Sequence, residues 1–351
     1  MNKIKSKAVK VKIKHTEKVR KELIERNLLR TSLKILKRGE YAFLPVNDKI
    51  NFSLENFDIT EAYFCRNKSK TGSYKESVKI PKNIKKYLPS SFDVIGNILF
   101  IKLNDKLLDY KQNIGKAILD SHKNISSVYL VESVSGEFRT RDLELIAGKP
   151  ETRTVHREFG INLLVDIKNV YFSPRLANER KRVADLVNKK EIVLDMFTGV
   201  APFSIMIAKY SKPEIIFAVD KNKSAIELAK KNIRLNKVYE NIKLICGDSK
   251  NIKNLINPKR ADRIIMNLPF SSYSFFEYAL GLVKDVTIIH YYDILVEENI
   301  DNRAIELKKM ANSMGLKLSN FKINKIKSYS PREFYIGIDI TAKKKFNADV
   351  A

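Results

Sequence analysis

The stretch Ile192-Val-Leu-Asp-Met-Phe-Thr-Gly-Val-Ala-Pro-Phe203 decides the fold. Its first part, Ile192–Asp195, is a short apolar run that ends in an acid, which is typical of a buried strand. Gly199 permits a tight turn, and the helix predicted over 202–210 presents free backbone N–H groups at its start. A strand, a glycine turn and a helix in this order are typical of a nucleotide-binding α/β domain.

Regular strand–helix alternation extends from this stretch toward the C-terminus. We expect further strands at 215–220, 242–247, 263–267 and 286–291, helices at 224–235 and 300–314, and two closing antiparallel strands at 322–329 and 334–341. Strands that alternate with helices predict an α/β fold with a mostly parallel, doubly wound sheet.

Polar side chains stand where these strands end, and in open parallel sheets ligands bind outside those ends. Asp220 ends the second strand, where a carboxylate suits bidentate hydrogen bonds to ribose hydroxyls. Asp248 ends the third strand and suits an adenine amino group, and Asn267-Leu-Pro269 ends the fourth. These residues predict a nucleotide-like ligand at this edge of the sheet.

Three features favour a methyltransferase over a nicotinamide-binding or a plain doubly wound domain. The first loop lacks the complete G-x-G-x-x-G pattern, and the sheet closes with an antiparallel pair. The fourth strand ends in Asn-x-Pro, as in methyltransferases that act on base nitrogens. Together these features resemble a class I, Rossmann-like methyltransferase that uses S-adenosyl-L-methionine.

Charge and composition indicate the kind of partner. The 351 residues hold 66 Lys and Arg against 40 Asp and Glu, a formal charge of +26. This surplus favours a nucleic-acid partner over a merely basic proteome, and residues 1–40 alone carry 14 basic residues and 4 acids. Two cysteines exclude a disulfide scaffold, and the scattered histidines predict no metal site. The low cysteine count favours a reducing, cytoplasmic compartment. Without an apolar run of membrane-spanning length, we expect no membrane association.

The chain divides into four predicted segments. Residues 1–65 form a small basic domain, and 66–80 are a polar linker. Residues 81–175 form a middle α+β domain, and 176–351 form the methyltransferase domain. Two smaller α/β (α+β) domains therefore precede the catalytic one.

Local patterns predict the elements of the two small domains. Thr16 is expected to cap a helix that runs to about Leu29, and a hairpin is expected to turn at Arg38-Gly39. In the middle domain we expect strand pairs that turn near Gly96 and at Phe159-Gly160, a helix over 113–122 and a strand over 127–132.

Upstream of the sheet, Tyr171-Phe-Ser-Pro-Arg-Leu-Ala-Asn-Glu-Arg180 is a more specific signal. With Gly136-Glu-Phe-Arg-Thr-Arg141 and Met266-Asn-Leu-Pro269, it resembles the archaeal and eukaryotic tRNA (guanine-37, nitrogen 1)-methyltransferases over essentially the whole chain. The resemblance implies a monomer whose partner is tRNA. It also implies that the N-terminal domain binds the tRNA elbow and that the other two grip the anticodon arm.

The resemblance assigns the catalytic roles. Methylation of a guanine ring nitrogen requires removal of a proton, and the general base that the resemblance implies is Glu179. Arg139 is expected to bind the guanine oxygen as negative charge develops there, while Asn267 and Pro269 orient the base. Taken alone, Glu179 is an ordinary carboxylate at a helix start, and Arg139 is one more surface arginine.

The binding residues fall into two sets. The expected cofactor contacts are Tyr171, Arg175, Asp195, Phe197, Gly199, Val200, Asp220, Lys221, Asp248 and Asn267. Asp195 is expected to support the loop through backbone N–H groups rather than touch the ligand. Packing is the alternative for Tyr171, Phe197 and Val200, and a phosphate contact or a structural role for Arg175. The expected tRNA phosphate contacts are Lys10, Lys12, Lys14, Lys18 and Lys21, with a solvated basic face as the alternative.

Two departures from the family pattern bear on the cofactor and the substrate. Ala201 replaces the second glycine of the family's Gly-x-Gly, so its methyl is expected close to the methionine part of the cofactor. The run Phe270–Tyr273 is similar to the corresponding segment in the archaeal branch of the family, whose members also methylate carbon 7 of 4-demethylwyosine. Two rival functions are an aminocarboxypropyl transferase of that pathway and a non-enzymatic RNA-binding protein.

Overall fold

The computed structural model describes residues 3–47, 58–65, 73–135, 140–258, 260–330 and 332–345. The chain forms two compact units, one of Met1–Pro81 with Asp120–His122 and one of Lys82–Leu119 with Lys123–Ala351. Residues 66–72 of the expected linker lie outside the described residues. The expected boundary after residue 175 falls inside the second unit and stays a prediction. Among the described helices, none combines the length and apolar character needed to cross a membrane.

The first unit is built on a sheet with the strand order β2-β3-β1-β4. Its elements are β1 (Lys3–Lys12), α1 (Thr16–Glu25), β2 (Leu36–Arg38), β3 (Tyr41–Pro45), β4 (Asp58–Cys65) and the short α2 (Tyr74–Ser77). The hairpin at Arg38-Gly39 is confirmed, whereas β4 was not predicted. Thr16 is not the helix cap, because α1 already begins at Thr16 and no side chain caps it. Leu29 lies beyond the helix, which ends at Glu25.

The second unit begins with a sheet of order β5-β6-β7-β8. Its elements are β5 (Asp93–Ile95), β6 (Ile98–Ile101), α3 (Lys111–Ser121), β7 (Ser127–Ser135) and β8 (Thr140–Gly148). The turn at Gly96 is confirmed, and only glycine fits there. Its φ is +57°, and a Cβ would lie 2.0 Å from Thr154 Oγ1. Strand β8 was not predicted.

A hairpin then links this sheet to the larger one. The hairpin of β9 (Arg153–Glu158) and β10 (Ile161–Asp166) turns at Phe159-Gly160, as predicted. Asn232 on α6 (Lys223–Leu235) is fully buried and bonds the backbone N–H of Leu164 at 2.6 Å and its carbonyl at 3.0 Å. The same amide donates to the carbonyl of Val200. This asparagine therefore fixes the hairpin against the helix and the first loop of the large sheet.

The large sheet has the strand order β13-β12-β11-β14-β15-β17-β16. Its strands are β11 (Ile192–Asp195), β12 (Ile215–Asp220), β13 (Ile242–Cys246), β14 (Ala261–Met266), β15 (Val283–Val296), β16 (Leu316–Ser328) and β17 (Glu333–Lys344). The strands from β11 to β15 pair in parallel, and β17 pairs antiparallel with β15 and β16. The predicted doubly wound sheet with a closing antiparallel pair is confirmed.

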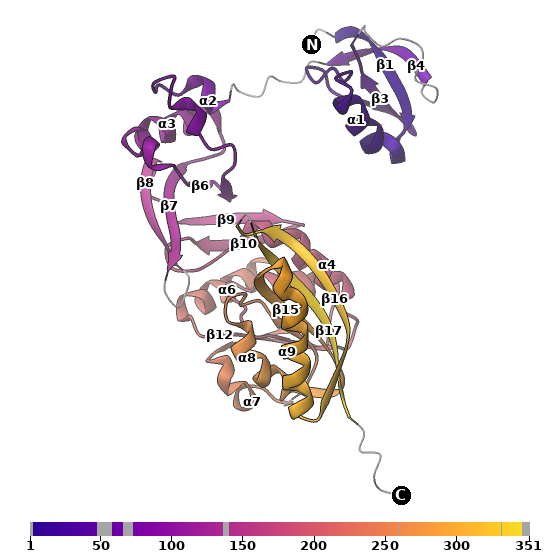
Figure 1. Cartoon of the computed structure of the whole chain (residues 1–351), viewed down its shortest axis with the longest axis vertical. Helices are drawn as coiled ribbons and strands as arrows, with labels where there is room; N and C mark the ends of the chain where they lie inside the picture. The colour runs from indigo at the N-terminus through magenta and orange to yellow at the C-terminus, as the bar shows by residue number, and fades with distance from the viewer. Residues whose placement is uncertain are drawn as a thin grey trace, which may run out of the picture. The chain divides into compact units, whose positions relative to one another are not determined.

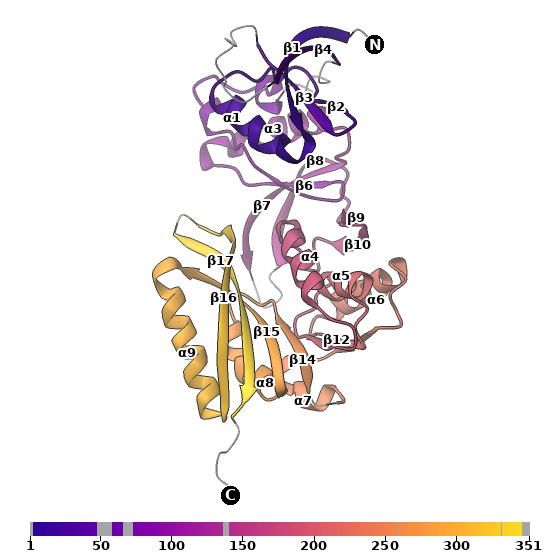
Figure 2. The ribbon, with the colours of Figure 1, turned by 90° about the vertical axis from the view of Figure 1, so that its right-hand side faces the viewer.

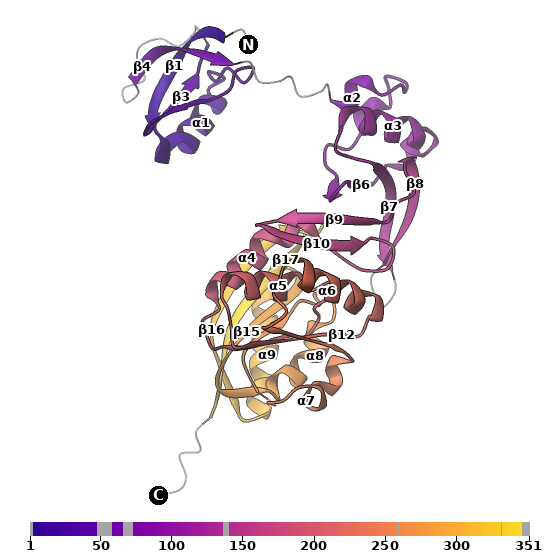
Figure 3. The same ribbon diagram turned by 180° about the vertical axis from the view of Figure 1, so that it is seen from behind.

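Helices cover both faces of this sheet. One core joins α4 (Ala177–Leu186), α5 (Pro202–Tyr210) and α6 to one face, as Figure 3 shows. A second core joins α7 (Ile252–Leu255), α8 (Ser272–Leu280) and α9 (Ile300–Ser313) to the other face, which Figure 1 shows in front. Figure 2 shows the sheet edge-on between α9 and the helices α4–α6. Strand order reverses between β11 and β14, so their carboxyl ends flank the crevice where such sheets bind ligands.

Candidate functional site

A cavity opens at the carboxyl ends of β11, β12, β13 and β14. Residues of the cavity wall come from the loops that follow these strands, from the 170–176 segment and from α8. The structure brings eight expected cofactor contacts to this wall: Tyr171, Phe197, Gly199, Val200, Asp220, Lys221, Asp248 and Asn267. The residues that the sequence placed at separate strand ends thus surround one space.

The buried side chain of Asp195 stabilises the first loop of the cavity. The hydroxyls of Thr198 and Ser204 donate to Asp195 Oδ2 at 2.9 and 2.7 Å, and the carboxylate is 1% exposed. Burial raises the pKa of Asp195 to about 6, although the two hydroxyls favour the ionised form. Asp195 supports the loop rather than lining the cavity, and side-chain hydroxyls provide most of that support where backbone donors were expected.

Gly199 and Asp220 form the part of the wall suited to a ribose. The backbone N–H of Gly199 donates to Asp220 Oδ2 at 2.6 Å, and that of Asn222 donates to Oδ1 at 2.9 Å. Burial raises the pKa of Asp220. The φ of Gly199 is +55°, and a Cβ there would point into open space. The glycine therefore leaves room in the cavity that a side chain would occupy.

Asp248 closes the neighbouring part of the wall. Its Oδ1 accepts the backbone N–H of Lys250 at 2.9 Å, and its Oδ2 lies 3.8 Å from Lys221 Nζ. Phe197 packs edge-on against Phe275 of α8, with ring centroids 5.0 Å apart. A carboxylate beside two aromatic rings can recognise a flat base that carries an amino group.

Arg175, Pro269 and Ala201 do not line the cavity. The guanidinium of Arg175 donates to Asp93 Oδ1 at 2.6 Å, which supports the structural alternative rather than a cofactor contact. Pro269 is buried beside Asn267 but is not part of the wall. Ala201 is fully buried with a left-handed backbone, φ +66°, and also lies outside the wall. The expectation that its methyl lies close to the methionine part of the cofactor stays a prediction.

Glu179 lies in the first turn of α4 and is 6% exposed. Its carboxylate does not line the cavity, but it accepts a hydrogen bond from the hydroxyl of Tyr292 at 2.8 Å. The ring of Tyr292 lies next to that of Tyr335, whose hydroxyl donates to the side-chain oxygen of Asn267. Two neighbouring tyrosines therefore connect the surroundings of Glu179 to the cavity wall at Asn267.

Comparisons with known proteins agree with this site. Residues 154–319 match the TRM5/TYW2 methyltransferase domain, 75–152 the TYW2 N-terminal domain and 8–53 the tRNA methyltransferase 5 N-terminal domain. The tRNA (guanine(37)-N(1))-methyltransferase Trm5b of Pyrococcus abyssi is 42% identical over 334 residues, covering 95% of this chain and 98% of its own. The chain belongs to the TRM5/TYW2 methyltransferase family.

Two further relatives cover different shares of the chain. The complex of aTrm5 with tRNALeu has a TM-score of 0.68 and 34% identity, covering 95% of this chain and 99% of that one. The tRNA(Phe) (4-demethylwyosine(37)-C(7)) aminocarboxypropyltransferase of Methanocaldococcus jannaschii is 32% identical over 249 residues. The matched region covers 71% of this chain and 96% of that relative.

The cavity fits S-adenosylmethionine, the cofactor of the TRM5/TYW2 family. Asp220 offers acceptors for ribose hydroxyls, Asp248 offers one for an amino group, and Gly199 leaves the space that a Cβ would take. Phe197 and Phe275 supply apolar walls for a base. The donor and acceptor set thus matches the chemistry of an adenosine.

The sequence did not predict several residues of the cavity wall. Arg180, Thr198, Asn222, Ser249 and Phe275 line the cavity without having been predicted there. Arg180 stands in the quoted family motif but had no role assigned, and Phe275 lies on α8, which was not predicted as a helix. Thr198 and Ser249 follow predicted strands directly, so the strand-end rule would have found them.

Arg139, the expected guanine-oxygen contact of this TRM5/TYW2 family member, lies outside the described residues, so its position is untested.

In the first unit, Lys10 and Lys12 alternate along β1 with Val9 and Val11, which pack under α1. The two lysines therefore lie on the sheet face that α1 does not cover.

Lys14, Lys18 and Lys21 occupy different places on this unit. Lys18 and Lys21 lie on α1, and Lys14 is exposed in the turn between β1 and α1. Lys10 Nζ lies over the ring of Tyr41 at 4.4 Å. The role of the five lysines as tRNA phosphate contacts stays a prediction.

Proposed function

We propose that this methyltransferase moves the methyl group of S-adenosylmethionine to nitrogen 1 of guanine 37 in tRNA, with Glu179 as the general base. The observation that carries the proposal is the connection from Glu179 through Tyr292 and Tyr335 to Asn267 at the cavity wall. A buried carboxylate, a positioned amide and an adenosine-shaped cavity are the parts that such a transfer needs.

The chain's own residues account for binding, orientation and proton removal. Asp220 and Asp248 hold the adenosine, and Phe197 packs against its base. S-adenosylmethionine, when bound, supplies an electrophilic methyl group on sulfur. Asn267 orients the guanine, whose target edge must leave the base stack to reach the site. Glu179 accepts the N1 proton as N1 bonds to the methyl carbon, and Arg139 donates to the guanine oxygen.

The share of the chain that the relatives cover supports guanine 37 as the target. The guanine-37 relative matches 95% of the chain, and a separate model for the N-terminal domain of that group matches residues 8–53. The aminocarboxypropyl transferase relative matches only 71%. We infer that the N-terminal unit binds the tRNA elbow, that the rest of the chain grips the anticodon arm, and that the enzyme acts as a monomer.

A second candidate function is additional methylation of carbon 7 of 4-demethylwyosine at the same position. Phe270, which follows the Asn-Leu-Pro motif, is 55% exposed and packs edge-on against Tyr329, with centroids 5.4 Å apart. Exposed aromatic rings beside the target site suit stacking on a larger tricyclic base.

Mass spectrometry of nucleosides tests these functions. The enzyme and S-adenosylmethionine are incubated with tRNA that carries guanine 37 or 4-demethylwyosine at that position. We expect a gain of ~14 Da on guanine, whereas a gain of ~101 Da on 4-demethylwyosine would indicate aminocarboxypropyl transfer. Methylation of both bases would establish the bifunctional enzyme. Binding of tRNA without modification of either base would contradict the proposal and favour an RNA-binding protein.

A further inference from the structure

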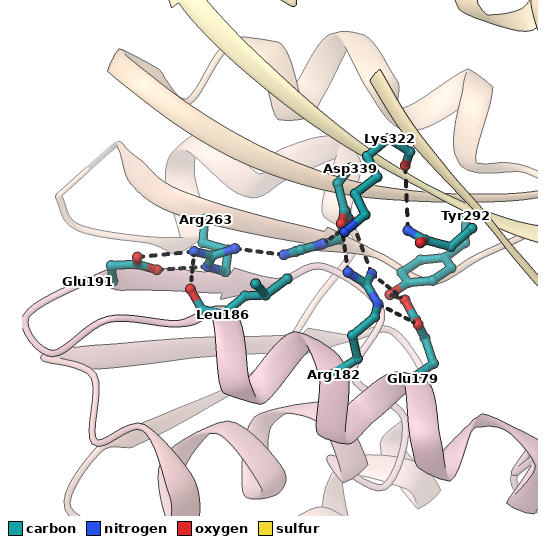
Figure 4. Close-up of polar contacts among 10 residues, drawn as sticks. Glu179, Arg182, Leu186, Glu191, Arg263, Tyr292, Lys322 and Asp339 are labelled. Carbon is teal, nitrogen blue, oxygen red and sulfur yellow. Dashed lines mark hydrogen bonds and ion pairs between the residues drawn. The ribbon is translucent and has the colours of Figure 1, made fainter. Parts of the chain in front are cut away.

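Both carboxylate oxygens of Glu179 are already engaged within the protein. Arg182, one turn along α4, donates through Nε to Oε2 at 2.8 Å and through Nη2 to Oε1 at 2.7 Å (Figure 4). Tyr292 on β15 adds its hydroxyl to Oε1 at 2.8 Å. A carboxylate held by a bidentate arginine alone is stabilised as the anion and is a weak proton acceptor. A working base here requires something that draws Arg182 away.

Asp339 on β17 competes with Glu179 for the guanidinium of Arg182. Arg182 donates to it through Nη1 at 2.7 Å and through Nη2 at 3.0 Å, so one guanidinium lies between two carboxylates. Strands β15 and β17 pair so that His290 is opposite Asp339 and Tyr292 is opposite Gly337. A Cβ at residue 337 would lie 3.0 Å from the Tyr292 ring and 3.4 Å from Glu179 Oε1. Glycine at this register position therefore leaves room for the tyrosine–carboxylate pair.

His290 holds Asp339 in its ionised form. Arg263 can only donate, so His290 Nε2, 2.8 Å from Arg263 Nη1, must be the acceptor. The imidazole proton is therefore on Nδ1, which donates to Asp339 Oδ1 at 2.6 Å. Burial lowers the pKa of His290, and the charges of Arg263 and Arg182 lower it further. The charge of Arg263 is balanced by Glu191, 2.7 Å away.

The charges in this buried cluster do not cancel. Glu179 and Asp339 carry two negative charges, Arg182 carries one positive charge, and His290 is neutral. Burial opposes the ionisation of Asp339, but hydrogen bonds from His290 and Arg182 outweigh it and hold the pKa of Asp339 far below its usual range. Burial also raises the pKa of Tyr292, which keeps its proton. Glu179 and Asp339 are thus two carboxylates that share the single guanidinium of Arg182.

We propose that Asp339 and Tyr292 are positioning residues that set the strength of Glu179 as a base. Asp339 shares the positive charge of Arg182, which leaves Glu179 able to accept the guanine N1 proton. Tyr292 stabilises the ionised carboxylate and fixes its direction. The inference rests on the proposed function of Glu179, because without a proton to accept the cluster has no role in the reaction.

The groups that surround Glu179 and its partners come from four elements. The titratable and charged side chains that face this cluster are Arg182 on α4, Arg263 on β14, His290 and Tyr292 on β15, and Tyr335 and Asp339 on β17. We expect the loss of Asp339 and the loss of the Tyr292 hydroxyl to have opposite effects on the strength of Glu179 as a base. Without Asp339, Arg182 serves Glu179 alone and weakens it as a base. Without the Tyr292 hydroxyl, the anion loses one hydrogen bond and becomes a stronger base.

The test is the pH dependence of single-turnover methyl transfer to guanine-37 tRNA. We expect D339N to shift the acidic limb of the profile to lower pH by roughly one unit and to reduce the plateau rate roughly three- to tenfold. Y292F should shift the limb to higher pH by a similar amount. The matched control is Y291F, since Tyr291 is equally buried but donates to Asp293 on the other side of β15, and its profile should not move.

Shifts in the two opposite directions would support the inference. It is overturned if D339N and Y292F only slow the reaction, leaving the limb in place, or shift the limb in the same direction. Thermal unfolding and the affinity for S-adenosylhomocysteine report whether each variant is folded, and Y292F still tests the inference if D339N is not. Failure of the proposed function would look different, because the wild type would not methylate guanine 37 or E179Q would retain full activity.

Discussion

Arg180 is a buried charge whose removal has a calculable cost. The side chain is 1% exposed, and Nε and Nη2 donate to the carboxylate of Glu158 on β9 at 2.6 and 2.5 Å. Both terminal nitrogens also donate to the carbonyl of Ser173 at 3.2 Å, and the guanidinium lies over the ring of Phe172. Replacement by methionine, Arg180→Met, keeps the aliphatic bulk and removes the charge.

The expected loss is large because the partner stays charged and buried. The side chain of Glu158 is 4% exposed, and the imidazole of His156 lies 3.4 Å from its carboxylate. Removal of one member of a buried ion pair costs about 3–5 kcal/mol in the free energy of unfolding. The double variant E158Q/R180M no longer buries an unpaired charge, so we expect it to recover about 2 kcal/mol of that loss.

The loss should also depend on pH. Burial opposes ionisation of Glu158, but hydrogen bonds from His156 and Arg180 outweigh it and lower the pKa of this carboxyl. In the wild type, the ionised group therefore stabilises the fold above its unfolded pKa, and this stabilisation is lost as the pH falls through the folded value. In R180M the carboxyl is buried without its arginine, so its protonation at low pH relieves the penalty. The difference between the two proteins should shrink between about pH 7 and about pH 4.5.

Urea unfolding followed by circular dichroism at both pH values measures these differences. The matched control is R175M, because Arg175 is 49% exposed and pairs with Asp93 at the surface, where such pairs contribute about 0–1 kcal/mol. The reasoning is refuted if R180M loses no more stability than R175M, or if neither E158Q nor low pH reduces the loss.

Three further measurements test the cavity, the loop beneath it and the charge distribution. Asp220→Asn removes a charged acceptor from the cavity, so the Kd of S-adenosylhomocysteine measured by calorimetry should rise roughly 10- to 100-fold, and an unchanged Kd would exclude this residue as a contact. Because burial raises the pKa of Asp195 to about 6, its contribution to stability declines as the pH rises from about 4 through 6; Asp195→Asn should flatten that part of the stability curve, and a parallel curve would argue against a buried proton there. The Kd of tRNA should rise about 10³-fold between roughly 50 and 200 mM salt if about six phosphates are contacted, whereas a flat response in a filter-binding titration would be inconsistent with phosphate contacts.

Most of the large sheet was predictable because its signals are local. Short apolar runs, glycine turns and helical spacing placed the strands from β11 to β15 and the closing pair along the chain. The observed β15 (Val283–Val296) and β16 (Leu316–Ser328) are considerably longer than the predicted 286–291 and 322–329. The elements that were missed lack such signals. Strand β4 pairs only with β1 at the sheet edge, and its exposed and buried residues do not alternate cleanly. The aromatic residues of α8 obscured its helical period.

The site was predictable to the extent that strand ends define it. Asp220, Asp248 and Asn267 meet because parallel strands end on one edge of a sheet. The role of Glu179 comes from the family motif and stays a prediction. Arg175 shows the limit of that reasoning. It stands in the same motif, yet its partner is Asp93, 82 residues earlier in the chain, and no local pattern indicates that pairing.

The sequence by itself determined the succession of strands in the large sheet and the polar side chains at the strand ends, because period and turn chemistry act over a few residues. Only the tertiary structure decided what surrounds Glu179. Insertion of β17 between β15 and β16 brings Asp339 to Arg182, 157 residues apart. The place of β15 in the sheet brings Tyr292 to Glu179, 113 residues apart. Strand order and register create these contacts, and both depend on packing of the whole sheet rather than on neighbouring residues.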